Sequence, residues 1–189
     1  MRIAVLAWGS LVWDRKGLAV ADDFKPNGPR LPIEYCRVSG GVRLTLVIDE
    51  AFGASCATYS ALSAVGDLDA AIENLRLREG MPGVRGVGFV DVASVQHSDG
   101  AMERHPQAVA AIKAWALANG YDAAIWTALA SNFHEADKAA EPFLVETAIC
   151  YLEALDAPKL AAALDYIRSA PPEVQTPVRV AVNARWPEG

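Results

Sequence analysis

The first thirteen residues constrain the fold of this chain more than any other stretch. Residues 2–7, Arg-Ile-Ala-Val-Leu-Ala, are apolar after the arginine and lead into Trp8, Gly9 and Ser10. A short apolar run that ends near glycine is typical of a strand buried on both faces. Because a small residue at a strand exit allows close approach to the backbone, the amides of Gly9, Ser10 and Leu11 are candidates to bind a ligand oxygen. A plain tight turn after a core strand is the alternative interpretation.

Length and composition indicate a globular protein. The 189 residues fit one domain with a helical extension, and the net charge of −6 argues against a nucleic-acid partner. Cys36, Cys56 and Cys150 lack the spacing of a disulfide framework, so we expect reduced thiols and a cytoplasmic location. No apolar run reaches the length of a membrane span, and early charged residues argue against a signal peptide, so we expect no membrane partner. The oligomeric state stays open.

Hydrophobic patterns and turn residues predict alternating strands and helices. Residues 14–32 are rich in charge, glycine and proline and are expected to form a loop. Gly40-Gly41 between two apolar runs is a hairpin signal. We predict strands at 33–39, 43–49, 55–62, 86–92 and 122–128, helices at 67–79, 103–119, 142–155 and 158–169, and an extended tail after Pro171-Pro172.

The helix at 67–79 carries the main catalytic candidate, Glu79. Asp67 is a suitable N-cap, and Gly80 is a suitable C-terminal stop. Glu79 ends the apolar stripe formed by Leu68, Ile72 and Leu75. A carboxylate in that position must be paired, hydrated or shifted to a higher pKa.

A structural explanation of Glu79 competes with a catalytic one. A glutamate at a helix end often reaches water, and Arg76 and Arg85 are near enough in sequence to pair with it. Helical periodicity directs Arg76 and Arg78 to the sides of the helix or outward.

Two stretches resemble the gamma-glutamyl cyclotransferase-like superfamily. Residues 8–13, Trp-Gly-Ser-Leu-Val-Trp, are similar to its (Tyr/Phe)-Gly-Ser-Leu-Ile-Trp opening. Residues 74–80, Asn-Leu-Arg-Leu-Arg-Glu-Gly, resemble the Leu-x-x-Arg-Glu-Gly stretch of the cation-transport-regulator type, whose glutamate is the catalytic acid/base. The resemblance covers residues 1–95, and the whole chain is more similar to bacterial and fungal members of the superfamily without an assigned reaction.

The resemblance implies a fold and a reaction. The fold is α+β, a small mixed β-barrel with surrounding helices in a single domain, 1–189. Residues 1–95 form the cyclotransferase-like core, and residues 96–189 complete the barrel and add a helical extension. The reaction is attack of the alpha-amine of a gamma-glutamyl compound on its own gamma-carbonyl, which yields 5-oxoproline and a released amine or amino acid without a cofactor.

The resemblance also implies roles for individual residues. Glu79 moves the proton, the amides of Gly9, Ser10 and Leu11 hold the oxyanion, and Trp8 lines the substrate site. An arginine, Arg43 or Arg37, binds the alpha-carboxylate.

Departures from the family pattern keep two other functions open. Trp8 stands where the named enzymes have tyrosine or phenylalanine, and the expected Arg-Gly-Thr-Pro segment after Ser39 is missing, so that only Arg43 corresponds. The chain is alternatively a non-catalytic small-molecule binding protein on the same fold, or an amide hydrolase or transferase with Glu79 as general base.

Other common chemistries find no support in the sequence. His97, His105 and His134 lack the close spacing of a metal site, so we expect no metal. Ser10 lies in no nucleophile elbow, and the glycines at 80–88 do not form a dinucleotide fingerprint.

Overall fold

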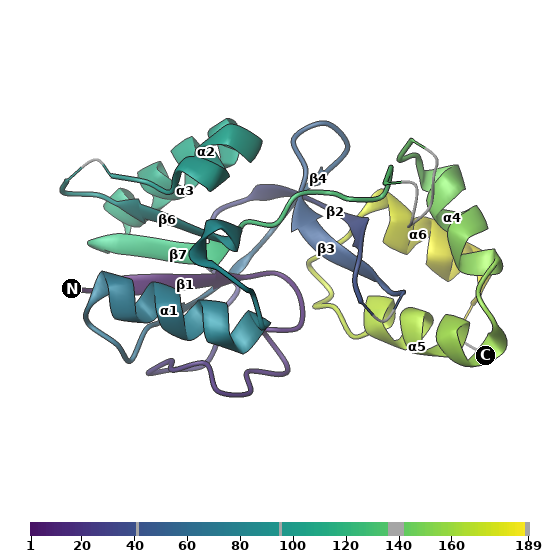
Figure 1. Ribbon diagram of the computed structural model, residues 1–189, viewed down its shortest axis with the longest axis horizontal. Helices are drawn as coiled ribbons and strands as arrows, with labels where there is room; N and C mark the ends of the chain where they lie inside the picture. The colour runs from purple at the N-terminus through teal and green to yellow at the C-terminus, as the bar shows by residue number, and fades with distance from the viewer. Residues whose placement is uncertain (41, 95, 136–141, 188–189) are drawn as a thin grey trace.

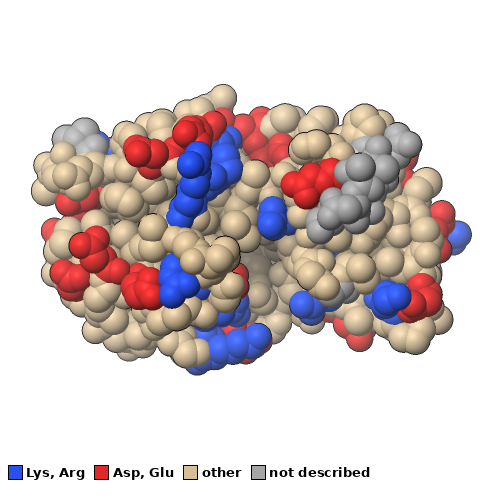
Figure 2. Space-filling view, viewed as in Figure 1, with Lys and Arg blue, Asp and Glu red and all other residues tan. Residues whose placement is uncertain are grey.

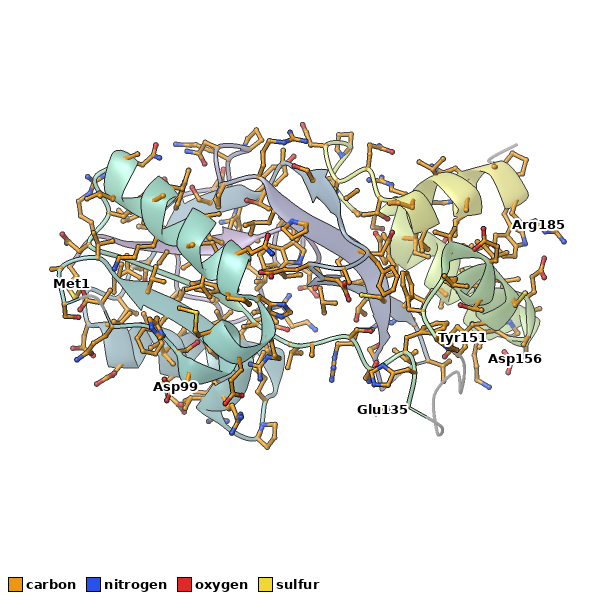
Figure 3. All side chains as sticks on the ribbon, turned by 90° about the horizontal axis from the view of Figure 1, so that it is seen from above. Met1, Asp99, Glu135, Tyr151, Asp156 and Arg185 are labelled. Carbon is orange, nitrogen blue, oxygen red and sulfur yellow. The ribbon has the colours of Figure 1, made fainter. Side chains whose placement is uncertain are left out.

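The computed structural model describes residues 1–40, 42–94, 96–135 and 142–187, and it shows an α+β protein. Its described strands form a four-stranded sheet and a three-stranded sheet. Figure 1 shows the first sheet with α1, α2 and α3 at one end of an elongated molecule, and the second sheet with α4, α5 and α6 at the other. Met1 and Asp156 accordingly lie at opposite ends in Figure 3.

The predicted opening strand is confirmed as β1 (Ile3–Ala7), a central strand of the four-stranded sheet. It pairs in parallel with β7 (Ala123–Thr127) and antiparallel with β5 (Tyr59–Leu62), while β6 (Val87–Asp91) pairs with β7. The order is β5-β1-β7-β6. Because β7 comes from the second half of the chain and lies between β1 and β6, the halves 1–95 and 96–189 share one sheet.

Helices cover both faces of this sheet, which explains why β1 is apolar at every position. Ile3, Val5 and Ala7 pack in one core with residues of α1 (Leu68–Glu79). Ala4 and Leu6 face the opposite core, which contains residues of α3 (Pro106–Ala118) and of the second sheet. Apolar side chains on both faces of a strand are the expected result of this layering.

The predicted hairpin is confirmed as β2 (Leu31–Val38) and β3 (Leu44–Ile48) of the second sheet. Its closing turn brings the amide of Ser39 to the carbonyl of Arg43 at 2.9 Å, and Gly41 of the predicted Gly40-Gly41 link lies outside the described residues. The register of β2 and β3 shifts between Glu34 and Arg37.

The single strand predicted at 55–62 is wrong, because the structure divides it between the two sheets. β4 (Ala54–Cys56) pairs with β2, whereas β5 pairs with β1. Between them, the buried Thr58 hydroxyl donates to the carbonyl of Pro29 at 2.5 Å, and its own carbonyl accepts from the amide of Gly28 at 3.0 Å. These bonds hold the chain where it passes from one sheet to the other.

The expected β-barrel is not closed within the described residues. Their strands form two separate hydrogen-bonded sheets, and no strand belongs to both. The division of residues 54–62 contributes to this difference, since an unbroken strand there would have joined the two sheets along one edge.

Helix α1 forms where the caps and the apolar stripe predict it. The Asp67 side chain accepts from the amide of Ala70 at 2.9 Å, and Gly80 ends the helix with a left-handed φ of 64°. Ile72 and Leu75 are buried against the first sheet. The cap and the stripe together fix the position of Glu79, the last residue of the helix.

The predicted helix at 103–119 is two helices, α2 (Asp99–Arg104) and α3, separated at His105. Pro106 lacks an amide hydrogen and is suited only to a first helical turn, so it starts a new helix. The predicted helices at 142–155 and 158–169 are observed as α4 (Val145–Glu153) and α5 (Ala157–Arg168).

The tail predicted as extended instead contains α6 (Pro177–Arg185). Val178 and Val182, one turn apart, are buried, and the Glu34 carboxylate accepts from the amide of Val178 at the start of the helix. Burial raises the pKa of Glu34, and the hydrogen bond from Thr176 opposes the rise. A tertiary contact with β2 therefore supports a helix that local pattern alone did not predict. In the part of the chain that the structure covers, no helix has the length and apolar character needed to cross a bilayer.

Candidate functional site

A cavity of about 400 Å³ brings both sheets and several distant segments together. Figure 2 shows the molecule hollowed between its two ends, with blue lysine and arginine side chains around the hollow. The walls come from the exits of β1 and β7, the β2–β3 hairpin, the end of α1, and α5. Its lining includes every residue predicted for the site, namely Trp8, Gly9, Ser10, Leu11, Arg43 and Glu79.

The turn formed by Gly9, Ser10 and Leu11, called the 9–11 turn below, follows the end of β1. The carbonyl of Gly9 accepts from the amide of Val12 at 3.0 Å, and that of Ser10 accepts from Asp14 at 2.7 Å. Within the described residues, the amides of Ser10 and Leu11 donate to no acceptor. The turn thus uses its carbonyls internally and leaves amide donors available beside the cavity, as the first turn of a helix does.

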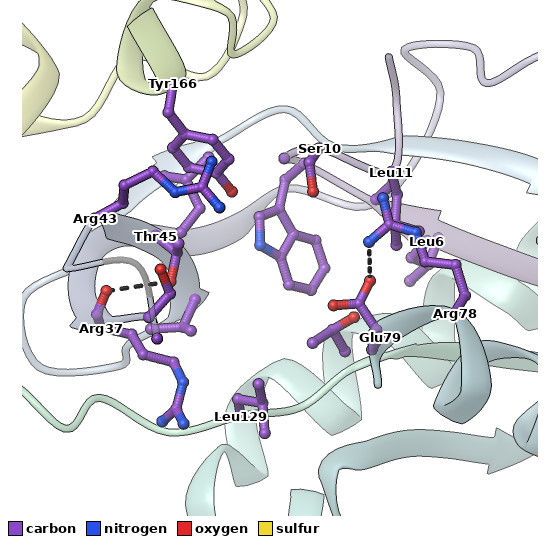
Figure 4. A pocket seen from close by; sticks show the side chains of 18 of the residues that line it. Leu6, Ser10, Leu11, Arg37, Arg43, Thr45, Arg78, Glu79, Leu129 and Tyr166 are labelled. Atoms are coloured by element: carbon purple, nitrogen blue, oxygen red, sulfur yellow. Dashed lines mark hydrogen bonds and ion pairs between the residues drawn. The ribbon is translucent and has the colours of Figure 1, made fainter. Parts of the chain in front are cut away.

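Glu79 faces the cavity with its side chain 19% exposed, and its partner is Arg78. One carboxylate oxygen accepts from Nη1 of Arg78 at 2.5 Å. In Figure 4 the other oxygen points toward the middle of the cavity. Neither suggested structural partner pairs with Glu79, because Arg76 binds Glu73 and Arg85 binds Glu103.

Helical periodicity places Arg78 at the side of the helix or outward, and the structure buries its side chain instead of exposing it. Its side chain is only 6% exposed, and its second terminal nitrogen donates to the carbonyl of Asp14. It therefore connects the loop after the 9–11 turn to Glu79. Helical periodicity could not predict this, since the loop that covers Arg78 is supplied by a distant part of the sequence.

The β2–β3 hairpin contributes two arginines to the opposite wall. Arg37 and Arg43 both line the cavity, and Nη1 of Arg37 donates to the carbonyl of Ala130 at 2.7 Å. Burial lowers the pKa of Arg37 from its ordinary value. The buried hydroxyl of Ser39 has no hydrogen-bond partner among the described residues. This wall offers two guanidinium groups and a hydroxyl to an anionic ligand.

Trp8 is 4% exposed, and it both lines the cavity and belongs to the larger core. Its indole therefore limits the width of the cavity while it anchors the exit of β1.

Sequence reasoning did not identify four further polar residues of the lining, Lys16, Thr45, Thr127 and Tyr166. Tyr166, from α5, lies with its ring 5.0 Å from the guanidinium carbon of Arg43. The hydroxyl of Thr127, at the exit of β7, is buried without a partner in the described parts of the chain. Lys16 has a left-handed φ of 48°. Only the polar character of the 14–32 loop pointed toward Lys16, and no local signal distinguished Tyr166 from a core tyrosine.

The remaining chemistry-bearing residues lie outside this cavity. Over the described ranges, no three histidine, cysteine, aspartate or glutamate side chains are grouped to hold a metal ion. Cys36 and Cys56 are buried, Cys150 is exposed, and all three thiols are free. His105 is buried between α2 and α3.

Comparisons with models of known families, with curated proteins and with solved structures give no match for this chain. The function of the cavity has to be inferred from its own geometry and chemistry.

Proposed function

We propose that this protein is a gamma-glutamyl cyclotransferase-type enzyme that converts a small gamma-glutamyl compound to 5-oxoproline and a released amine or amino acid. The observation that carries the proposal is that Glu79 and the 9–11 turn line the same cavity. The reaction needs a base at the attacking amine and donors at the carbonyl oxygen, only a few ångströms apart. A cavity of about 400 Å³ is in the range that small ligands occupy.

Glu79 is assigned the proton transfers. Its carboxylate oxygen that faces the cavity takes a proton as the alpha-amine attacks the gamma-carbonyl, and returns one to the departing nitrogen. Arg78 holds the other oxygen, so the carboxylate has a fixed orientation. The bond between the gamma-carbon and the leaving nitrogen breaks as the five-membered ring closes, and no redox change occurs.

The 9–11 turn and the hairpin arginines are assigned to binding. The amides of Ser10 and Leu11 donate to the oxygen of the gamma-carbonyl as negative charge develops there. Arg43 binds the alpha-carboxylate, with Arg37 beside it on the same wall. We also propose a relation to the family's fold, namely that the two sheets are an open form of its mixed barrel.

Product analysis of the unmodified protein tests this function. A panel of gamma-glutamyl amines, gamma-glutamyl dipeptides and glutathione is incubated with the protein, and 5-oxoproline is measured by mass spectrometry. We expect release from at least one compound. Glu103→Gln is the matched control for Glu79→Gln, because Glu103 lies in an exposed ion pair with Arg85 and does not line the cavity, so the activity of Glu103→Gln should equal that of the wild type.

The ion pair of Glu79 supports a second candidate, a binding protein without turnover. A carboxylate held by a buried guanidinium is a suitable acceptor for the ammonium group of a ligand even where no proton is transferred. If the whole panel stays intact while calorimetry detects binding of some members, the binding function replaces the cyclotransferase.

A further inference from the structure

Tyr166 connects the C-terminal helices to the cavity. It lies on α5, far in sequence from the other residues of the site, and its ring is held from two sides. Trp13 meets the ring edge-on at a centroid distance of 5.8 Å, and the guanidinium of Arg43 lies over it at 5.0 Å. Such contacts fix the direction in which the hydroxyl points.

The hydroxyl of Tyr166 lies beside the 9–11 turn. Its oxygen is 3.7 Å from the position that a Cβ atom on Gly9 would occupy, and the Ser10 side chain forms a hydrogen bond that opposes the rise in its pKa. The phenol oxygen therefore lies close to the backbone of Gly9. The hydroxyl and the 9–11 turn thus line the same part of the cavity.

Ser10 is a hydrogen-bond partner of this hydroxyl, and a ligand oxygen can compete with it for the phenol proton. In the described parts of the chain the hydroxyl donates to no carbonyl or carboxylate oxygen, unlike three other tyrosines. The hydroxyls of Tyr35, Tyr59 and Tyr151 donate to the carbonyl of Ile167, the carboxylate of Glu173 and the carbonyl of Val42, respectively. Burial raises the pKa of Tyr166, so the phenol keeps its proton at neutral pH.

We propose that the Tyr166 hydroxyl is the side-chain donor that joins the amides of the 9–11 turn at the gamma-carbonyl oxygen. This inference rests on the cyclotransferase function proposed above. It makes the C-terminal helices part of the catalytic site, since α5 supplies a group that contacts the reacting carbonyl. The hydroxyl only donates a hydrogen bond to the developing oxyanion, and it keeps its proton throughout.

Tyr166→Phe tests this role because phenylalanine keeps the ring contacts with Arg43 and Trp13 and removes the hydroxyl alone. Loss of one oxyanion donor lowers kcat by about 10²–10³-fold in characterised enzymes, and we expect a fall of about 10²-fold. KM should stay within about threefold, because the oxyanion exists only in the transition state. Tyr59→Phe is the control, since Tyr59 also loses a hydroxyl hydrogen bond but does not line the cavity.

The outcomes separate the inference from the proposed function. A fall in kcat that is confined to Tyr166→Phe, with KM and the unfolding midpoint unchanged, supports the donor role. An active wild type with an equally active Tyr166→Phe overturns the inference and leaves the cyclotransferase in place. Equal losses in Tyr166→Phe and Tyr59→Phe, or a loss in Tyr166→Phe that follows its unfolding midpoint, reduce Tyr166 to a structural role. A wild type inert to the whole panel overturns the proposed function and with it the donor role.

Discussion

Replacing Arg78 with methionine tests whether the buried ion pair between Arg78 and Glu79 stabilises the folded protein. Methionine keeps most of the apolar contact of the arginine stem but removes its charge and donors. The change deletes the 2.5 Å bond to Glu79 and the bond to the carbonyl of Asp14, and it leaves a carboxylate that is only 19% exposed without its partner.

The expected magnitude follows from burial. A hydrogen bond to a charged group contributes about 1.5–3 kcal/mol, and the partial exposure of Glu79 reduces the penalty of leaving it unpaired. The buried Nε of Arg78 has no hydrogen-bond partner among the described residues, and its removal offsets part of the loss. We therefore expect the free energy of unfolding to fall by about 2–4 kcal/mol. For a chain of this length, that corresponds to a midpoint lower by about 4–16 °C.

Urea denaturation, with the slope compared between variants, measures this change. Arg85→Met is the matched control, because its ion pair with Glu103 is 73% and 61% exposed, and such surface pairs contribute about 0–1 kcal/mol. If Arg78→Met is no more destabilising than Arg85→Met, the inference that burial makes the Arg78–Glu79 ion pair more stabilising than a surface pair is refuted.

Three further predictions follow from other parts of the structure. Gly88→Ala should lower the free energy of unfolding by about 1–3 kcal/mol, because its Cβ would lie 2.2 Å from the buried indole of Trp126. Gly17→Ala has open space around it and should leave the free energy of unfolding unchanged, and urea denaturation compares the two variants. Burial lowers the pKa of His105, so the unfolded chain binds its proton more readily and stability is lost as pH falls below about 6.5. Between pH 8 and pH 5, the free energy of unfolding should fall less in His105→Gln than in the wild type. An equal fall in both proteins contradicts this prediction. Arg43→Gln should raise KM about tenfold or more with a smaller effect on kcat, and unchanged KM removes Arg43 from substrate binding.

The sequence predicted elements whose signals are local. The opening strand has an apolar run and a glycine exit, and α1 has Asp67 at its start, Gly80 at its end and a stripe between them. Since Glu79 ends that stripe, its position beside the first sheet could be inferred as well. These features depend on the residue itself and its near neighbours, which are what pattern analysis evaluates.

The features that the sequence did not predict depend on tertiary contacts. The division at Thr58 requires Gly28 and Pro29 from a distant loop, and α6 is supported by the buried Glu34 of β2. Thr176-Pro177 does carry a cap-and-proline signal for α6, but the alternating valines that follow favour a strand. The role of α5 in the cavity has no local signal, because Tyr166 reaches the cavity only through the packing of the C-terminal helices.

The most direct test of the cyclotransferase is the turnover of Glu79→Gln on a substrate that the wild type accepts. Glutamine keeps the size of the side chain and an oxygen that can accept from Arg78, but it is not a base. A general base contributes about 10²–10⁴-fold to the rate, so kcat for 5-oxoproline release should fall by at least about 10²-fold. Affinity for the substrate, measured by calorimetry on the variant, should stay close to the wild-type KM. If Glu79→Gln releases 5-oxoproline as fast as the wild type, Glu79 is not the base and the central claim is wrong.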